Sequence, residues 1–168
     1  PSATVTGTAV NNQLAVPAPI TGATLLSGLA GTDSLGTSFA AGDTITVNGT
    51  PITFVASGAS GNQLNVTDNI TALLAKIDSI TATASPSTVA GGAITLHTGT
   101  TSNLTVTSSN ASAFAALGFT PTVTATRGGG ATSTGSPARA GGCTRTTSAR
   151  SQISGAEAAL EDGVDGRL

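Results

Sequence analysis

The sequence has 168 residues, enough for one ordinary domain, and charged residues make up only 8% of it, against roughly 25% in an average soluble protein. The net charge of −2 and the absence of Trp and Tyr leave neither a basic patch nor stacking aromatics, so nucleic acid is not an expected partner. The apolar runs are short and interrupted by Thr and Gly, which excludes a membrane-spanning segment.

Residues 1–32 carry little periodic pattern, and we interpret them as an extended connector that leads into a module. Pro17 and Pro19 favour extended chain, while the stretch 24–29 suits a short helical turn or an edge strand. The chain begins at Pro1, without Met or a charged leader region, so we expect a segment of a longer protein.

The strongest local pattern is a β-hairpin around Asn48-Gly49. Residues 44–47 and 51–55 alternate on either side of this pair, and a two-residue turn with positive φ at both positions favours Asn-Gly. Pro51 falls at the start of the return strand, where a missing N–H does least harm. The alternation places Ile52 and Phe54 on one face of the hairpin.

A helix is predicted to begin after a loop at 58–62. Thr67 is the expected cap, and Asp68 complements the positive end of the helix dipole. The apolar stripe follows helical spacing and is expected to cover one face of a sheet, with Lys76 off the stripe and Ile80 extending it. Its members are Ile70, Leu73, Leu74 and Ile77.

A second hairpin, a short helix and a final strand complete the predicted module. The hairpin joins the alternating runs 93–97 and 103–107, and Asn110 caps a short helix through Leu117 that Gly118 follows at the C′ position. Phe119 is expected to fold back onto the core, and Thr122–Thr124 to add a short strand. The predicted fold class is therefore α+β: a small antiparallel sheet of two hairpins with one amphipathic helix and one short helix packed on it, in a module spanning 33–126.

The composition changes at Arg127, and five of the six basic residues lie in the remaining segment. The runs Gly128–Gly130 and Gly141–Gly142 interrupt any pattern there, so residues 127–168 are predicted to be a disordered tail that is not native to the fold. Cys143, the single cysteine, excludes an internal disulfide and receives no role.

No residue set with catalytic or metal-binding chemistry is recognised, and no cofactor is expected. His97 is the only histidine, and its alternation with Leu96 places it on the solvent side of its strand, without partners for a zinc site. Asp33, Asp43, Asp68 and Asp78, four dispersed carboxylates of the predicted module, are interpreted as structural residues rather than a catalytic pair. Five Asn-x-Ser/Thr matches, at Asn48, Asn65, Asn69, Asn103 and Asn110, are interpreted as caps, turns and strand ends.

The ordered motifs resemble the module repeated in bacterial flagellar axial proteins. The resemblance is carried by Ala41-Gly42-Asp43-Thr44-Ile45-Thr46-Val47-Asn48-Gly49-Thr50, by Asp68 to Ile77, and by Leu104 to Asn110 with Ala116-Leu117-Gly118-Phe119. It is closest to the outer-domain region of a hook protein, over about residues 2–127, with flagellin and hook-associated proteins as competitors. The long helical termini through which axial proteins polymerise are absent from the sequence.

This resemblance implies a non-enzymatic, surface-exposed structural module of an extracellular flagellar hook or filament. The implied partners are neighbouring subunits of the same filament, and no nucleic acid, membrane or small-molecule substrate is expected. The alternative is an adhesin-like or carbohydrate-binding module of a secreted surface protein, although the missing Trp and Tyr leave no sugar-stacking platform.

Overall fold

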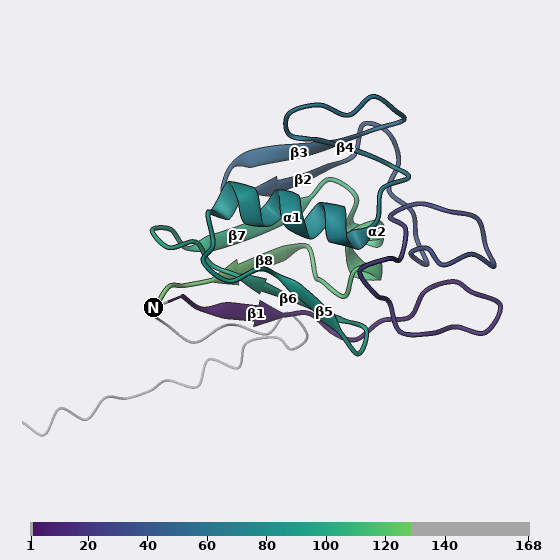
Figure 1. Cartoon of the computed structure of the whole chain (residues 1–168), viewed down its shortest axis with the longest axis horizontal. Coiled ribbons are helices and arrows are strands. Elements are labelled where there is room, and N and C mark those ends of the chain that lie inside the picture. Colours follow the sequence, from purple (N-terminus) through teal and green to yellow (C-terminus); the bar gives the residue numbers. More distant parts are fainter. Residues whose placement is uncertain (1, 129–168) are drawn as a thin grey trace, which may run out of the picture. The chain divides into compact units, whose positions relative to one another are not determined.

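The structure is a computed structural model that describes residues 2–128, and these belong to one compact unit of mixed α+β structure (Figure 1). The predicted tail beyond residue 128 lies outside the described residues. The strands are β1 (Thr4–Thr6), β2 (Thr44–Val47), β3 (Thr50–Val55), β4 (Gln63–Asn65), β5 (Thr88–Ala90), β6 (Ala93–His97), β7 (Leu104–Ser108) and β8 (Thr122–Ala125), and the helices are α1 (Ile70–Thr81) and α2 (Ala111–Ala116).

The Asn-Gly hairpin is confirmed. Strands β2 and β3 pair antiparallel with Val47 opposite Thr50, and the turn residues Asn48 and Gly49 have φ values of 49° and 83°. Both values lie in the left-handed region that a primed turn requires. Pro51 precedes the part of β3 that pairs with β4, so its missing N–H removes no bond on that side.

The second predicted hairpin is wrong, because β6 and β7 belong to different sheets. Strand β6 is the centre of a three-stranded sheet in the order β1-β6-β5, whereas β7 lies in a five-stranded sheet in the order β4-β3-β2-β7-β8. The hairpin partner of β6 is β5, across Gly91 and Gly92, which have φ values of 55° and 81°. Alternation identifies a strand but not its partner, and the two-residue Gly-Gly turn was the signal that specified the pairing.

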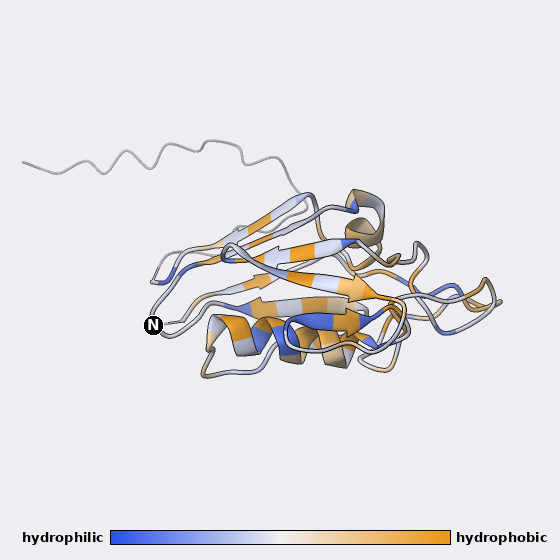
Figure 2. Cartoon of the chain, turned by 90° about the horizontal axis from the view of Figure 1, so that it is seen from above, coloured by the Kyte–Doolittle hydropathy of each residue, from blue (hydrophilic) through white to orange (hydrophobic). Residues whose placement is uncertain are grey.

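The single predicted antiparallel sheet is therefore replaced by two sheets that share one hydrophobic core. Strand β1 of the smaller sheet runs beside β8 of the larger one. The larger sheet also contains a parallel pair, β3 with β4, which the sequence did not reveal. Along the strands, apolar and polar residues alternate, so that each sheet has one buried and one solvated face (Figure 2).

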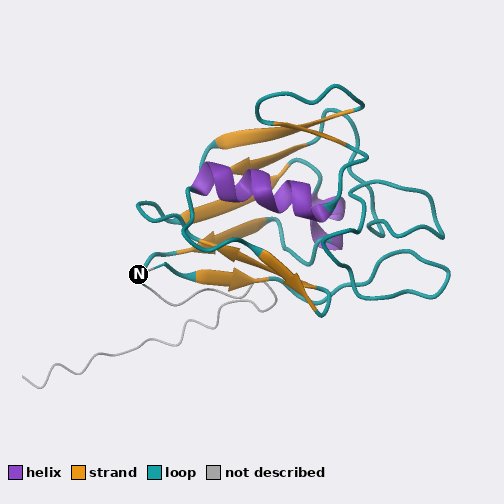
Figure 3. Cartoon of the chain, viewed as in Figure 1, coloured by secondary structure: helices purple, strands orange, loops and turns teal. Residues whose placement is uncertain are grey.

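Helix α1 lies across the strands and covers the buried face of the larger sheet (Figure 3). All four residues of its predicted stripe are buried, from Ile70 to Ile77, and Ile80 packs at the edge of the core. The predicted cap is wrong by two positions: Asn69, not Thr67, accepts the Ala72 N–H (3.0 Å). Among the helices of the described residues, none has the length and apolar character to cross a membrane.

The short helix α2 ends as predicted. Asn110 accepts the Ala113 N–H (3.0 Å), and Gly118 follows the helix with a φ of 89°. The reversal at Gly118 turns Phe119 back onto Phe114, with ring centroids 5.4 Å apart. The N-terminal segment approaches Gly118 closely, so a side chain at this position would clash with the Thr8 carbonyl.

The N-terminal segment is not a connector but part of the fold. Strand β1 pairs with β6, with Val5 opposite Leu96. Further along, Ile20, Leu26, Leu35 and Phe39 are each at most 1% exposed and belong to the common core. Since these residues follow no strand or helix period, burial here is decided by long irregular loops that the sequence pattern could not identify.

Candidate functional site

Each of the four carboxylates of the described chain accepts hydrogen bonds from neutral groups. Asp43 accepts the Ala40 N–H and the Asn110 amide (both 2.8 Å), which ties the start of β2 to α2. Asp68 accepts the Asn65 N–H (2.8 Å), which faces outward from β4. These partners are main-chain or amide donors of the fold itself, as expected for structural carboxylates rather than an acid–base pair.

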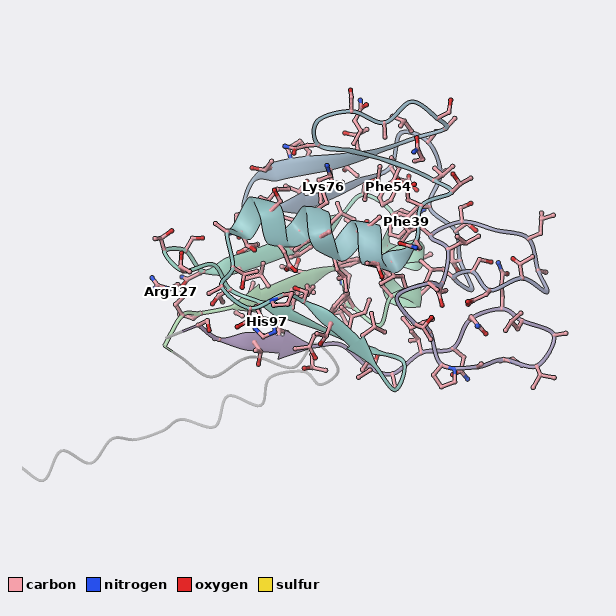
Figure 4. The ribbon with its side chains drawn as sticks, in the orientation of Figure 1. Phe39, Phe54, Lys76, His97 and Arg127 are labelled. Atoms are coloured by element: carbon pink, nitrogen blue, oxygen red, sulfur yellow. The ribbon has the colours of Figure 1, made fainter. Side chains whose placement is uncertain are left out.

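His97 lies on the face of β6 opposite Leu96, half-buried and paired in register with Thr4 (Figure 4). Within residues 2–128, no group of three His, Cys, Asp or Glu side chains is placed to hold a metal ion. Cys143 lies outside the described residues, as do Gly129 and Gly130.

The five asparagines of the Asn-x-Ser/Thr matches occupy caps, turns and strand ends, as predicted. Asn69 and Asn110 are the N-caps of the two helices. Asn48 Oδ1 accepts the Thr105 N–H across the sheet (2.8 Å), and Asn65 Oδ1 accepts the Ala59 N–H (3.1 Å). Asn103 Oδ1 accepts the Arg127 N–H (3.0 Å). Their side-chain oxygens thus satisfy main-chain donors that regular pairing leaves unpaired.

The loop 98–103, between β6 and β7, contacts the chain just before β1 and just after β8. The Ala3 N–H donates to Thr98 Oγ1, and the Thr98 N–H donates to the Ala3 carbonyl (both 2.9 Å). At its other end the loop holds Arg127 through Asn103. Its Gly99 packs so closely on the Thr81 carbonyl that a Cβ there would lie 2.1 Å from the oxygen. We call this end of the unit the proximal end; it is at the left of Figure 1.

At the opposite end, on the right of Figure 1, the irregular segment 8–42 forms two projecting loops, which we call the distal loops. A polar network joins them. Asp33 Oδ1 accepts the Asn12 amide and the Thr24 hydroxyl (both 2.8 Å), and the Gln13 amide donates to Ser34 Oγ (2.7 Å). The Gly31 N–H also donates to the Gln13 carbonyl (2.8 Å). These bonds fix the loops in place without strand pairing.

The large apolar side chains that the described chain exposes all belong to these distal loops. Val16 and Leu29 are each 81% exposed and Leu25 is 37% exposed. Their positions gave no sequence signal, because an apolar residue within an unpatterned segment can as well be buried, as Leu26 is. Single exposed apolar residues are common on protein surfaces, so they do not define a site by themselves.

A pocket of about 370 Å³ opens between α1 and β5. The sequence identified two of its lining residues, Leu74 in the apolar stripe and Asp78 among the structural carboxylates, but not the pocket, because the other wall comes from a stretch predicted to be a loop. The lining residues are Gly22, Thr71, Leu74, Ala75, Asp78, Pro86, Ser87, Thr88 and Val89. The pocket combines aliphatic walls with one carboxylate, so it offers a ligand both apolar and charged contacts.

Comparisons of the chain with protein-family models, curated proteins and solved structures found no match.

Proposed function

We propose that this chain contributes a structural, non-enzymatic module to the outer surface of a bacterial flagellar hook or a related flagellar filament. The observation that carries the proposal is that one loop, 98–103, contacts both Ala3, just before β1, and Arg127, just after β8. A unit whose ends lie close together can be inserted into a longer chain without disturbing that chain's own fold.

The surface chemistry supports the same proposal. On the solvated face of the larger sheet, Thr46, Thr107 and Thr122 stand in one row across β2, β7 and β8. A face of threonines remains wettable with few charges, and β-branched residues suit the pleated strands. Each of the four carboxylates among the described residues accepts hydrogen bonds from neutral donors of the fold, and this structural use supports the non-enzymatic proposal. The proposed localisation is therefore extracellular, with neighbouring subunits as partners.

The test is immunogold electron microscopy of the flagellated bacterium that encodes the chain, with antibodies raised against the folded unit. Gold is expected on the hook or filament of intact cells. A strain that lacks the codons for residues 2–126 serves as the control, and its flagella should lose both the gold and part of their outer diameter. The deletion includes residues 2–32 because these belong to the fold.

Gold spread over the cell body, with hook and filament unlabelled, would contradict the proposal and favour the adhesin-like alternative. An unchanged flagellar profile in the deletion strain would contradict it as well.

A further inference from the structure

The pocket between α1 and β5 has aliphatic walls. Leu74 and Ala75 form the helix side, and Pro86 and Val89 form the strand side. Hydrogen bonds join helix and neighbouring segments at both ends of the pocket: Thr71 with the Gly22 carbonyl at one end, and Asp78 with Ser87 at the other. The pocket is therefore held open by fixed elements, with an aliphatic middle and a carboxylate at one end.

Asp78 carries a charge that no basic group of the described chain neutralises. Its carboxylate accepts the Ser87 N–H (2.8 Å) and hydroxyl (2.5 Å), both neutral donors. Lys76, the nearest base in the sequence, is turned away, and its Nζ donates to the Gly61 carbonyl (2.6 Å) on another side of α1 (Figure 4). Two neutral hydrogen bonds leave carboxylate lone pairs free to accept from a cation.

The strand beside the pocket also has an unpaired main-chain edge. Strand β5 is the last strand of its sheet, and Val89 lies opposite Ile94 of β6. The Ile94 carbonyl points the other way, because it accepts the Gly7 N–H from the β1 side (2.9 Å). Val89 and Ile94 thus form a non-hydrogen-bonded pair, and the N–H and carbonyl of Val89 point outward from the edge.

We propose that this pocket binds a lysine side chain presented by an extended segment of a partner polypeptide. The methylene stem lies on Leu74, Ala75 and Val89, and the ammonium group meets the Asp78 carboxylate. The main chain of the partner residue pairs with Val89, as when a peptide adds a strand to a sheet edge. The proposal concerns the unit itself and stands whether or not the unit belongs to a flagellum.

The edge beyond Val89 is closed to longer pairing. Pro86 lacks an N–H, and the outward N–H of Ser87 is already bonded to Asp78. The edge thus accepts one partner residue rather than a continuous strand, which directs recognition to the side chain in the pocket.

In the experiment, the ¹⁵N-labelled full chain is titrated with the capped pentapeptide Thr-Val-Lys-Val-Thr, and binding is measured from the changes in amide chemical shifts. Saturable shifts are expected at Ala75, Asp78 and Val89. The matched peptide with norleucine in place of lysine keeps the stem and loses the charge, so it should bind about two- to fivefold more weakly, as for one exposed ion pair.

Two variants test the location of the site. Ala75→Leu fills the pocket from its helix wall and leaves the Asp78–Ser87 bonds intact, so the lysine peptide should no longer bind. Ser79→Leu, on an exposed position of α1 outside the pocket, is the matched control and should bind as the original chain does. Equal affinity for the two peptides, absence of saturable shifts, or unchanged binding to Ala75→Leu would each overturn the proposal.

Discussion

Two regions of the unit reach the same core by different means. From residue 43 to residue 126, regular strands and helices bury side chains at periods of two and 3.6, and main-chain pairing satisfies most of the backbone. From residue 7 to residue 42, isolated bridges, single main-chain hydrogen bonds outside regular strands and side-chain hydrogen bonds do this work instead. Yet Leu26 and Leu35 in the irregular region are as fully buried as Ile45 and Ile52 in the regular one.

The two regions meet in a stacked pair of rings. Phe39 from the irregular segment lies against Phe54 of β3, with centroids 4.4 Å apart and planes 13° from parallel (Figure 4). The two regions therefore differ in how their backbone hydrogen-bonding groups find partners, and not in how deeply their apolar side chains are buried. Four substitutions, ordered from the largest expected effect to the smallest, test this comparison.

The largest effect is expected for Phe54→Ala, because Phe54 is fully buried and joins the two regions. Loss of its ring should lower the free energy of unfolding by about 3–5 kcal/mol, measured by chemical denaturation. A double-mutant cycle with Phe39→Ala should give a coupling of about 0.5–1.5 kcal/mol. Thr53→Ala, on the other face of β3, is the control and should cost less than about 1 kcal/mol.

Leu26→Ala compares burial with exposure inside the irregular region. Leu26 is 0% exposed and Leu29 is 81% exposed, three residues away. Leu26→Ala should cost about 2–5 kcal/mol, whereas Leu29→Ala should change stability by less than about 0.5 kcal/mol. Thermal and denaturant unfolding of the two variants measure these changes. Equally small losses of stability in both variants would indicate that residues 1–32 are a connector after all.

Asp33→Ala tests the polar network that replaces strand pairing in the distal loops. It removes the acceptor of Asn12 and Thr24, of which Thr24 is completely buried. Leaving these donors unsatisfied should lower the free energy of unfolding by about 1–3 kcal/mol. Amide hydrogen exchange should accelerate over residues 11–35 more than over β2 and β3. Thr37→Ala, at an exposed position of the same segment, should leave both measurements unchanged.

The smallest effect is expected for Asn69→Ala, which removes the cap of α1 and leaves the apolar stripe intact. The cost should be about 1 kcal/mol in denaturant unfolding, because one main-chain donor at the helix end loses its acceptor. Thr67→Ala, at the position that the sequence suggested as the cap, is the comparison. A larger loss for Thr67→Ala than for Asn69→Ala would contradict the cap assignment.

Local chemistry accounts for the parts of the fold that could be predicted. The Asn48-Gly49 turn, the stripe of α1, the Asn110 cap and the return of Phe119 each depend on residues within about one helical turn or one hairpin, and all of them are confirmed. The pocket at Asp78 could not be predicted in this way. It needs α1 and β5 to be adjacent, and the strand Thr88–Ala90 read as loop because only three residues form it.

By itself, the sequence determined the class of the fold, its first hairpin, its two helices and the faces that they bury, because these follow from periods and turn residues that are close along the chain. Only the tertiary structure decided that β6 pairs with β1 and β5, that the segment 2–42 contributes side chains to the core, and that one loop contacts both Ala3 and Arg127. The physical reason is that alternation sets which face of a strand is buried, but long-range packing chooses the partner strand and the loops that cover it.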